Sequence, residues 1–340
     1  MAAMADIPVL MTVDFPAPLV ERLRAVSPRL KIRLQPTRKA EDLPNDLMAE
    51  AEILYTARAL PEPEKVPNLR WIQFHYAGVD HAVEHSLLRS EVKVTTLSGA
   101  AAPQVAEFAV AAMLALARKF PTLMEDKREK RWAEDRFTRF EPAEMRGSTV
   151  GIVGYGSTGR EVARICRALG ARVLASKRNL KQLPDAGYAL AEVGDREAEL
   201  AARLYPPQAL GSMASECDFL VVVAPLTPAT RGLVNEKVLK RMKASAFLID
   251  VSRGGVVDHS ALIEALNAGR LAGAALDVYP VEPLPETSPL WGMPNLILSP
   301  HVGGASAKYL ERATDLFAEN LRRYVVNEPL LNLYDPQQGY

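Results

Sequence analysis

Short apolar segments alternate with longer amphipathic ones along the first hundred residues. Each apolar segment is bounded by Pro, Gly or charged residues, which is typical of buried strands. The predicted strands are 8–13, 30–34, 52–56, 69–74 and 92–97, and a helix is predicted at 18–26. Strands that alternate with helices indicate βαβ units and a parallel sheet.

A second alternating series begins near residue 148. Its predicted strands are 149–153, 171–175, 219–224, 246–251, 273–278 and 296–299, and its predicted helices are 158–169, 235–242 and 259–268. Between the two series, the stretch from Pro103 is rich in Ala and Leu, which favours a long buried helix. A last predicted helix, 305–327, places apolar residues near a 3,4 spacing. The pattern predicts an α/β protein, and the length is sufficient for two domains.

Composition and charge are those of an ordinary globular protein. The 340 residues are 48% hydrophobic, with 41 basic and 41 acidic side chains. A net charge of zero argues against nucleic acid or an anionic membrane as the partner. Cys166 and Cys217 cannot form a disulfide framework and suit a reducing compartment. The N-terminal segment lacks a basic region, and the longest apolar run, 108–117, is about half the ~20 residues that cross a bilayer. We expect a cytoplasmic protein.

A glycine-rich loop joins the predicted strand 149–153 to the helix that follows it. Gly154 permits a tight turn, Gly156 lets the backbone approach a pyrophosphate, and Gly159 lets the helix pack against the strand. The free N–H groups near Ser157 and Thr158 then face the phosphates together with the positive end of the helix dipole. The loop has the required strand before it and a second strand after the helix. It therefore predicts a dinucleotide site.

The residues at the end of the second strand are expected to contact the adenosine ribose. An acidic side chain there would accept a hydrogen bond from the 2′-hydroxyl, but this chain has Ser176, Lys177 and Arg178. Two cations can donate to a 2′-phosphate and balance its charge, which favours NADP. In the other interpretation, both cations face solvent and NAD is bound through other contacts.

Several motifs in one order resemble the D-isomer-specific 2-hydroxyacid dehydrogenase family. They are HYAGVDHA at 75–82, GYGSTG at 154–159, AFLIDVSRGGVVD at 246–258, ALDVYPVEPLP at 275–285 and LILSPHVGGAS at 296–306. The resemblance covers essentially the whole chain. It implies two doubly wound parallel-sheet domains with a cleft between them. The Rossmann cofactor domain would span 103–304, and a flavodoxin-like substrate domain would combine 1–102 with 305–340.

The resemblance also implies a catalytic set of Arg253, Glu282 and His301. A histidine can transfer the proton of a 2-hydroxyl near neutral pH, because its unperturbed pKa is about 6.5. Glu282 would hold the other ring nitrogen, and Arg253 would bind the substrate carboxylate and the 2-oxygen. His81, His85 and His259 are interpreted as ordinary surface or helix residues, and the role of His75 stays open.

Further contacts follow from the same resemblance. The substrate carboxylate would bind backbone N–H groups of Ala77, Gly78 and Val79, and the cofactor would contact Pro225, Val251, Asp277 and Gly303. Phosphite-oxidising relatives carry lysine where this chain has Ala77, and formate-oxidising relatives carry glutamine where it has Glu282. Both departures argue against those two activities. The resemblance implies a small 2-keto acid or D-2-hydroxy acid as substrate, similar to glyoxylate or hydroxypyruvate. Tyr76 and Trp291 are candidates for its pocket. No metal site is predicted.

Two segments keep alternative interpretations. The stretch 179–212 is longer than the family usually has, and it is either a surface insertion, a cover for the adenine side or a subunit contact. The charge-dense stretch 121–146 is either a solvated helix with a few packed aromatics or an arm that forms a homodimer; interleaved acids argue against nucleic acid. A second functional class also shares this fold, namely dinucleotide-sensing proteins of the corepressor type. The absence of long disordered tails favours the enzyme.

Overall fold

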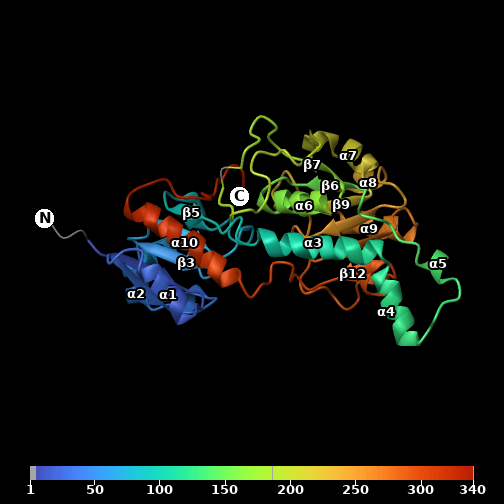
Figure 1. The fold of residues 1–340 in the computed structure, drawn as a ribbon. Coiled ribbons are helices and arrows are strands. Elements are labelled where there is room, and N and C mark those ends of the chain that lie inside the picture. Colours follow the sequence, from blue (N-terminus) through green and yellow to red (C-terminus); the bar gives the residue numbers. More distant parts are fainter. Residues whose placement is uncertain (1–4, 186, 340) are drawn as a thin grey trace. The chain divides into compact units, whose positions relative to one another are not determined.

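The computed structural model describes residues 5–185 and 187–339 (Figure 1), and the chain forms two compact units. Of the described residues, the first unit contains 5–101, 187–190 and 306–339, and the second contains 102–185 and 191–305. Residues 1–4 and 340, at the ends of the expected substrate domain, lie outside the described residues. The short segment 187–190 comes from the insertion, and the sequence did not indicate that it belongs with the first unit.

The first unit contains a five-stranded parallel sheet in the order β2-β1-β3-β4-β5. Its strands are β1 (Ile7–Met11), β2 (Leu30–Leu34), β3 (Ile53–Thr56), β4 (Trp71–Phe74) and β5 (Lys93–Thr95). Its helices are α1 (Ala17–Arg24), α2 (Asn45–Glu50) and α10 (Tyr309–Val325), with short 3-10 turns at Ala40–Asp42, Pro63–Lys65 and Ser86–Arg89. Every residue of β3 and β4 is buried, because helices cover both faces of the sheet.

The C-terminal helix α10 completes this first unit. It lies against α1 (Figure 1), and its Leu316, Phe317 and Leu321 join the core beside Trp71 and Tyr55. The rings of Tyr55 and Phe317 are 4.7 Å apart between centroids. Residues far apart in the sequence therefore build one core.

The second unit contains a seven-stranded parallel sheet in the order β12-β11-β10-β9-β6-β7-β8. Its strands are β6 (Thr149–Val153), β7 (Arg172–Ser176), β8 (Arg203–Tyr205), β9 (Phe219–Val222), β10 (Phe247–Asp250), β11 (Gly273–Leu276) and β12 (Leu296–Leu298). Its helices are α3 (Ala102–Ala117), α4 (Phe120–Glu129), α5 (Arg136–Arg139), α6 (Ser157–Ala168), α7 (Leu210–Glu216), α8 (Glu236–Leu239) and α9 (His259–Asn267), with 3-10 turns at Pro207–Ala209 and Pro289–Gly292.

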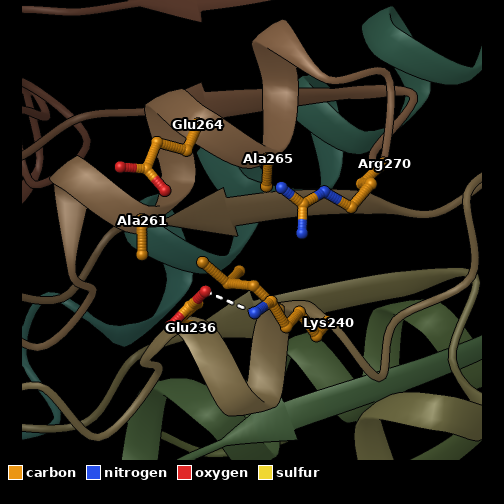
Figure 2. A pocket seen from close by; sticks show the side chains of 7 residues that line it. Glu236, Lys240, Ala261, Glu264, Ala265 and Arg270 are labelled. Atoms are coloured by element: carbon orange, nitrogen blue, oxygen red, sulfur yellow. Dashed lines mark ion pairs between the residues drawn. The ribbon is translucent and has the colours of Figure 1, made fainter.

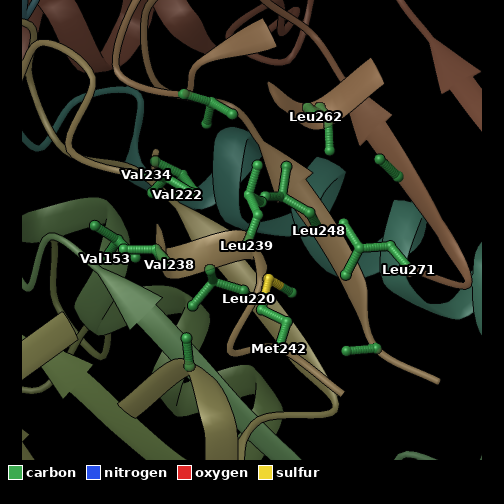
Figure 3. Packing of buried hydrophobic residues seen from close by; sticks show 14 of the residues in the cluster. Val153, Leu220, Val222, Val234, Val238, Leu239, Met242, Leu248, Leu262 and Leu271 are labelled. Carbon is green, nitrogen blue, oxygen red and sulfur yellow. The ribbon is translucent and has the colours of Figure 1, made fainter. Parts of the chain in front are cut away.

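The side chains of β9 alternate between two hydrophobic clusters, one on each face of the second sheet. Leu220 and Val222 pack into the cluster drawn in Figure 3, with residues of α8 and α9. Phe219 and Val221 point to the other face and pack with α3 and α6. Successive side chains of a strand point to opposite faces, so a fully apolar strand is buried on both sides. The predicted α/β class with two parallel sheets is confirmed.

The chain crosses from one half of this second sheet to the other beside β6. From β6 it runs outward through β7 to β8, and it then returns to β9 on the opposite side of β6. In open parallel sheets, ligands bind at the carboxyl ends of the strands next to such a reversal. The reversal places the glycine loop, which follows β6, at the expected binding edge.

Some elements differ from the sequence prediction. The insertion 179–212 contributes the edge strand β8, which pairs with β7, and the start of helix α7. Three residues that include an arginine give too weak a pattern to predict a strand. Helix α10 begins at Tyr309 rather than near 305, and α8 ends at Leu239 rather than 242. Among residues 5–185 and 187–339, no helix is long and apolar enough to cross a membrane.

Candidate functional site

The predicted residues of the second unit follow the carboxyl ends of its parallel strands. The glycine loop follows β6, Lys177 follows β7 and Pro225 follows β9. Arg253 follows β10, Asp277 and Glu282 follow β11, and His301 follows β12. Because the strands are all parallel, these ends lie along the same edge of the sheet.

The three glycines of the loop have different surroundings. A Cβ on Gly159 would lie 2.1 Å from the Gly154 carbonyl oxygen, and a Cβ on Gly154, which has φ +102°, would lie 2.8 Å from the Ala224 nitrogen. A Cβ on Gly156 would meet nothing within 4 Å. Gly159 is therefore required by the close strand–helix packing, and Gly154 by its positive φ and by the backbone of Ala224. Gly156 presents its backbone to open space.

This loop has the features that a dinucleotide requires. Helix α6 begins at Ser157, and no side chain caps its N-terminus. The first-turn N–H groups of a helix have no acceptor within the helix, and the helix dipole places positive charge beside them. Open space at Gly156 next to these donors fits a pyrophosphate.

His301 and Glu282 form a hydrogen-bonded pair. Nδ1 of His301 lies 2.8 Å from Oε2 of Glu282, and Oε1 of Glu282 accepts a bond of 3.0 Å from the backbone N–H of Tyr279. The carboxylate is thus held from both sides and fixes one ring nitrogen of the histidine. The side chain of His301 is 41% exposed, so the imidazole is accessible. The structure brings these two predicted residues together.

The segment that carries His301 is held by Asp277. Oδ1 of Asp277 accepts bonds from the Ser299 hydroxyl at 2.7 Å and from the Val302 N–H at 2.8 Å, and Oδ2 accepts from the Gly303 N–H at 2.8 Å. His301 adopts a left-handed φ of 55°, which non-glycine residues rarely do. Bonds to the residues on both sides of His301 hold this unusual backbone conformation. Sequence reasoning had assigned Asp277 to the cofactor and missed this role.

Arg253 lies on a loop that packs closely against the residues after β11. A Cβ on Gly254 would lie 1.8 Å from the Tyr279 carbonyl oxygen, so only glycine fits there. Before Arg253, Ser252 donates to Asp250 through both its backbone N–H, at 3.1 Å, and its hydroxyl, at 2.5 Å. The guanidinium donates to the Ser252 carbonyl at 2.7 Å. The approach of Gly254 to Tyr279 places the Arg253 loop beside the segment that leads to Glu282.

The end of β7 carries the three residues predicted to contact the ribose. Ser176 is buried, Lys177 is half-buried and Arg178 is exposed. Burial lowers the pKa of Lys177, and the positive charges of Arg160 and Arg178 lower it further, whereas the carboxylate of Asp185 raises it. An acidic side chain therefore approaches this strand end in space although none is near it in the sequence. No sequence signal indicated that Asp185 would lie there.

The remaining predicted residues of the second unit differ in their burial. Val251 is buried, and Pro225 is exposed, with its carbonyl accepting from the Thr230 hydroxyl at 2.6 Å. A Cβ on Gly303 would lie 2.8 Å from Oδ2 of Asp277, so this position has no room for a side chain. Trp291 is 57% exposed.

In the first unit, the loop 77–79 follows the carboxyl end of β4. Ala77 is exposed, and Val79 is buried in the core. His75, just before the loop, is buried, with Nδ1 2.6 Å from the Tyr55 hydroxyl. Burial lowers the pKa of His75 to about 4, so the ring is neutral at neutral pH. His75 therefore belongs to the packing that supports this loop.

A separate small pocket lies between α8 and α9 and is shown in Figure 2. Glu236 and Lys240 form an ion pair of 2.5 Å at its edge, and Arg270 and Glu264 also line it. None of the predicted site residues lines this pocket. Within residues 5–185 and 187–339, no three His, Cys, Asp or Glu side chains are grouped to hold a metal ion.

Comparisons with known proteins point to one family. A model of the NAD-binding domain of D-isomer specific 2-hydroxyacid dehydrogenases matches residues 110–303. The glyoxylate reductase of Korarchaeum cryptofilum is 33% identical over 279 residues, which cover 81% of this chain and 78% of that protein.

Two solved structures extend the similarity over nearly the whole chain. A D-isomer specific 2-hydroxyacid dehydrogenase from Xanthobacter autotrophicus Py2, in complex with NADPH and MES, is 31% identical with a TM-score of 0.82, covering 99% of this chain and 100% of that one. An NADPH-dependent glyoxylate/hydroxypyruvate reductase from Sinorhizobium meliloti, in complex with NADP and sulfate, is 25% identical with a TM-score of 0.79, covering 98% and 100%.

Proposed function

Since the chain belongs to the D-isomer-specific 2-hydroxyacid dehydrogenase family, we propose that it reduces glyoxylate, hydroxypyruvate or a related small 2-keto acid with NADPH preferred over NADH. The protein is an oxidoreductase that transfers a hydride between NAD(P)H and a 2-keto acid. The alternative of a dinucleotide-sensing interaction protein is not favoured, because the similar proteins are named as reductases and dehydrogenases.

The pair formed by His301 and Glu282 carries the proposal. Glu282 accepts the Nδ1 proton of His301 and holds the ring, which leaves Nε2 available to donate a proton. A bound nicotinamide dinucleotide supplies the hydride for C2 of the keto acid. His301 then gives a proton to the oxygen on C2, so that the product is the neutral 2-hydroxyl group.

Arg253 is proposed to bind the substrate. Its planar guanidinium suits two oxygens at once, here those of the carboxylate and of C2. As the carbonyl is reduced, negative charge develops on the C2 oxygen, and a guanidinium beside that oxygen stabilises it. The close packing at Gly254 supports this role, because it restricts where the loop can place Arg253.

The loop 77–79 is proposed to give the substrate carboxylate further hydrogen bonds. Backbone N–H groups of Ala77, Gly78 and Val79 are suited to a carboxylate, since they donate without a counter-charge of their own. The buried Val79 and the packed His75 support a fixed loop conformation. Pro225, Val251, Asp277 and Gly303 are proposed as cofactor contacts, together with the glycine loop.

The preference for NADP is proposed from Lys177 and Arg178, which follow β7. Cations at this strand end can bind a 2′-phosphate. We expect Lys177→Asp to lower the ratio of kcat/KM with NADPH to kcat/KM with NADH. A ratio that does not change would contradict the role of Lys177.

The reaction itself is tested with purified protein and a panel of keto acids. We expect NADPH oxidation with at least one of glyoxylate, hydroxypyruvate, pyruvate and bulkier 2-keto acids. His301→Ala should lower kcat by several orders of magnitude, because proton transfer and positioning each contribute about 10²-fold or more, while the Kd of NADPH stays near that of the wild type. Retained turnover in this variant would contradict the role of His301.

The stretch 121–146 is proposed to form a homodimer. Trp132 and Phe137 are 84% and 82% exposed, which is unusual for large apolar side chains. Asp126 is buried and holds Arg139 through Nη2 at 2.9 Å and Nε at 3.2 Å, so the segment is ordered while its aromatics face outward. Light scattering is expected to give a dimer, and Trp132→Ser with Phe137→Ser a monomer. A wild-type monomer would contradict the proposal.

We also propose a cytoplasmic location. Cys166 and Cys217 are both buried and neither forms a disulfide, as suits a reducing compartment. Fractionation of cells that express the tagged protein tests the location, and recovery outside the cytoplasm would contradict it.

A further inference from the structure

The insertion is attached to helix α6 through Arg160, the residue that follows the last glycine of the loop. The Arg160 side chain is buried, and its guanidinium donates to three backbone carbonyls of the insertion, those of Leu183, Asp195 and Arg196. The two segments of the insertion that Arg160 contacts are also linked to each other, since the N–H of Asp185 donates to the Arg196 carbonyl at 3.0 Å. An arginine with three carbonyl acceptors holds the insertion at the N-terminal end of α6.

A second attachment uses Tyr155, which lies between the first two glycines. Its hydroxyl donates to Oδ2 of Asp195 at 2.5 Å. Asp195 is buried and also accepts the N–H groups of Glu199 and Leu200 at 2.9 and 3.0 Å. The glycine loop and the insertion are therefore parts of one hydrogen-bonded structure, and the insertion cannot be an independent surface loop.

These attachments hold one carboxylate beside Arg160, next to the glycine loop, whose Gly154 N–H donates to the Ser176 carbonyl at the end of β7 at 3.1 Å. Oδ2 of Asp185 lies 3.7 Å from Nε of Arg160, and its side chain is 28% exposed. Asp185 also interacts with Lys177, whose pKa it raises against the effects of burial and of the two arginines. Three cations, Arg160, Lys177 and Arg178, thus surround one carboxylate near the strand end that is expected to contact the ribose.

We propose that Asp185 is a specificity-determining residue that reads the 2′ position of the cofactor ribose. A carboxylate accepts a hydrogen bond from a 2′-hydroxyl and repels a 2′-phosphate, whereas Lys177 and Arg178 do the reverse. Asp185 thereby limits the preference for NADP and permits NAD to bind. The acceptor missing from the sequence at β7 is supplied by the insertion, which Arg160 positions. This inference rests on the proposed function, because it requires the dinucleotide to bind at the glycine loop.

The test measures binding of two cofactor fragments without turnover. Adenosine 2′,5′-bisphosphate and 5′-AMP differ at the 2′ position, and calorimetry gives a Kd for each. We expect Asp185→Asn to tighten binding of the bisphosphate by about tenfold, because it removes one repulsive charge–charge interaction in a partly solvated site. The Kd of 5′-AMP should change by less than threefold. Asp185→Glu keeps the charge and should keep the wild-type ratio of the two Kd values.

The matched control is Glu197→Gln, which removes an exposed carboxylate from the same insertion. It should leave both Kd values unchanged, which separates the effect of Asp185 from that of net charge. If both fragments bind the wild type but Asp185→Asn leaves their ratio unchanged, the role of Asp185 is wrong while the cofactor site stands. If neither fragment binds the wild-type protein, the cofactor site itself is wrong and the inference fails with it.

Discussion

Asp277 offers the sharpest test of how this site is held together. Its two oxygens accept three hydrogen bonds from the residues on both sides of His301, and Asp277 is only 3% exposed. In Asp277→Asn the side-chain oxygen can still accept from Ser299 and Val302. The new amide group then faces the N–H of Gly303, so two donors oppose each other.

The expected magnitude follows from these three bonds. One buried bond to a charged acceptor is lost, and two become bonds to a neutral acceptor. Bonds to charged groups contribute about 1.5–3 kcal/mol and neutral ones about 1 kcal/mol, so we expect a loss of about 2.5–7 kcal/mol in the free energy of unfolding. Ser299→Ala removes one hydroxyl bond to the same carboxylate and should cost about 1.5–3 kcal/mol, less than Asp277→Asn. We further expect kcat of Asp277→Asn to fall by about 10- to 100-fold, because His301 is no longer held in position.

The assays are denaturant unfolding, steady-state kinetics and fluorescence titration with NADPH. Unfolding free energies of the two variants that lie within 0.5 kcal/mol of each other would refute the reasoning, because Asp277 would then hold no more than Ser299 does. A change confined to the Kd of NADPH, with kcat and stability unchanged, would instead assign Asp277 to the cofactor alone.

Four further predictions concern other parts of the chain. Burial lowers the pKa of His75 from 6.5 to about 4, so the unfolded chain takes up a proton on this ring at a higher pH than the folded protein does. The free energy of unfolding therefore falls as the pH drops below 6.5, and the loss reaches about 3 kcal/mol near pH 4. Denaturant unfolding across this pH range should show a shallower loss for His75→Gln. Gly159→Ala should lower the free energy of unfolding by about 1–3 kcal/mol, since its Cβ would meet the Gly154 carbonyl, and calorimetry measures this. Gly156→Ala should leave stability unchanged and weaken NADPH binding by about tenfold or more, because a methyl group would occupy the approach to the pyrophosphate. Burial raises the pKa of Cys166 and of Cys217 to about 12, so a thiol reagent at pH 8 should modify neither until the chain unfolds; rapid reaction of the native protein would be contrary to this.

The sheets were the most predictable part of the fold, because their strands are apolar at nearly every position. The segment 219–224 contains β9, whose four residues are all buried. A short, continuous apolar run of this kind is typical of a strand that is covered on both faces of a parallel sheet. The strand β8 could not be predicted, since Arg203–Tyr205 gains its stability from pairing with β7 at the edge of the sheet. Its signal is tertiary and is absent from the local sequence.

The site was predictable where chemistry depends on residue type, and unpredictable where it depends on backbone groups. The glycine loop could be located from the spacing of its glycines alone. In the structure, Gly154 and Gly159 have no room for a side chain, and Gly156 faces open space. Asp277 holds the His301 segment mainly through two backbone N–H groups, which leave no trace in the sequence. The approach of Asp185 to Lys177 depends on how Arg160 gathers three carbonyls of the insertion, and no local pattern encodes that contact.

The central claim is that this chain reduces a 2-keto acid stereospecifically with His301 as the proton donor. The most direct measurement is a chiral analysis of the product formed from hydroxypyruvate and NADPH, with the wild type and His301→Ala compared side by side. We expect the wild type to form D-glycerate alone, with one NADPH consumed for each molecule formed, and the variant to form almost none. L-glycerate, a racemic product, or equal product from both proteins would contradict the account.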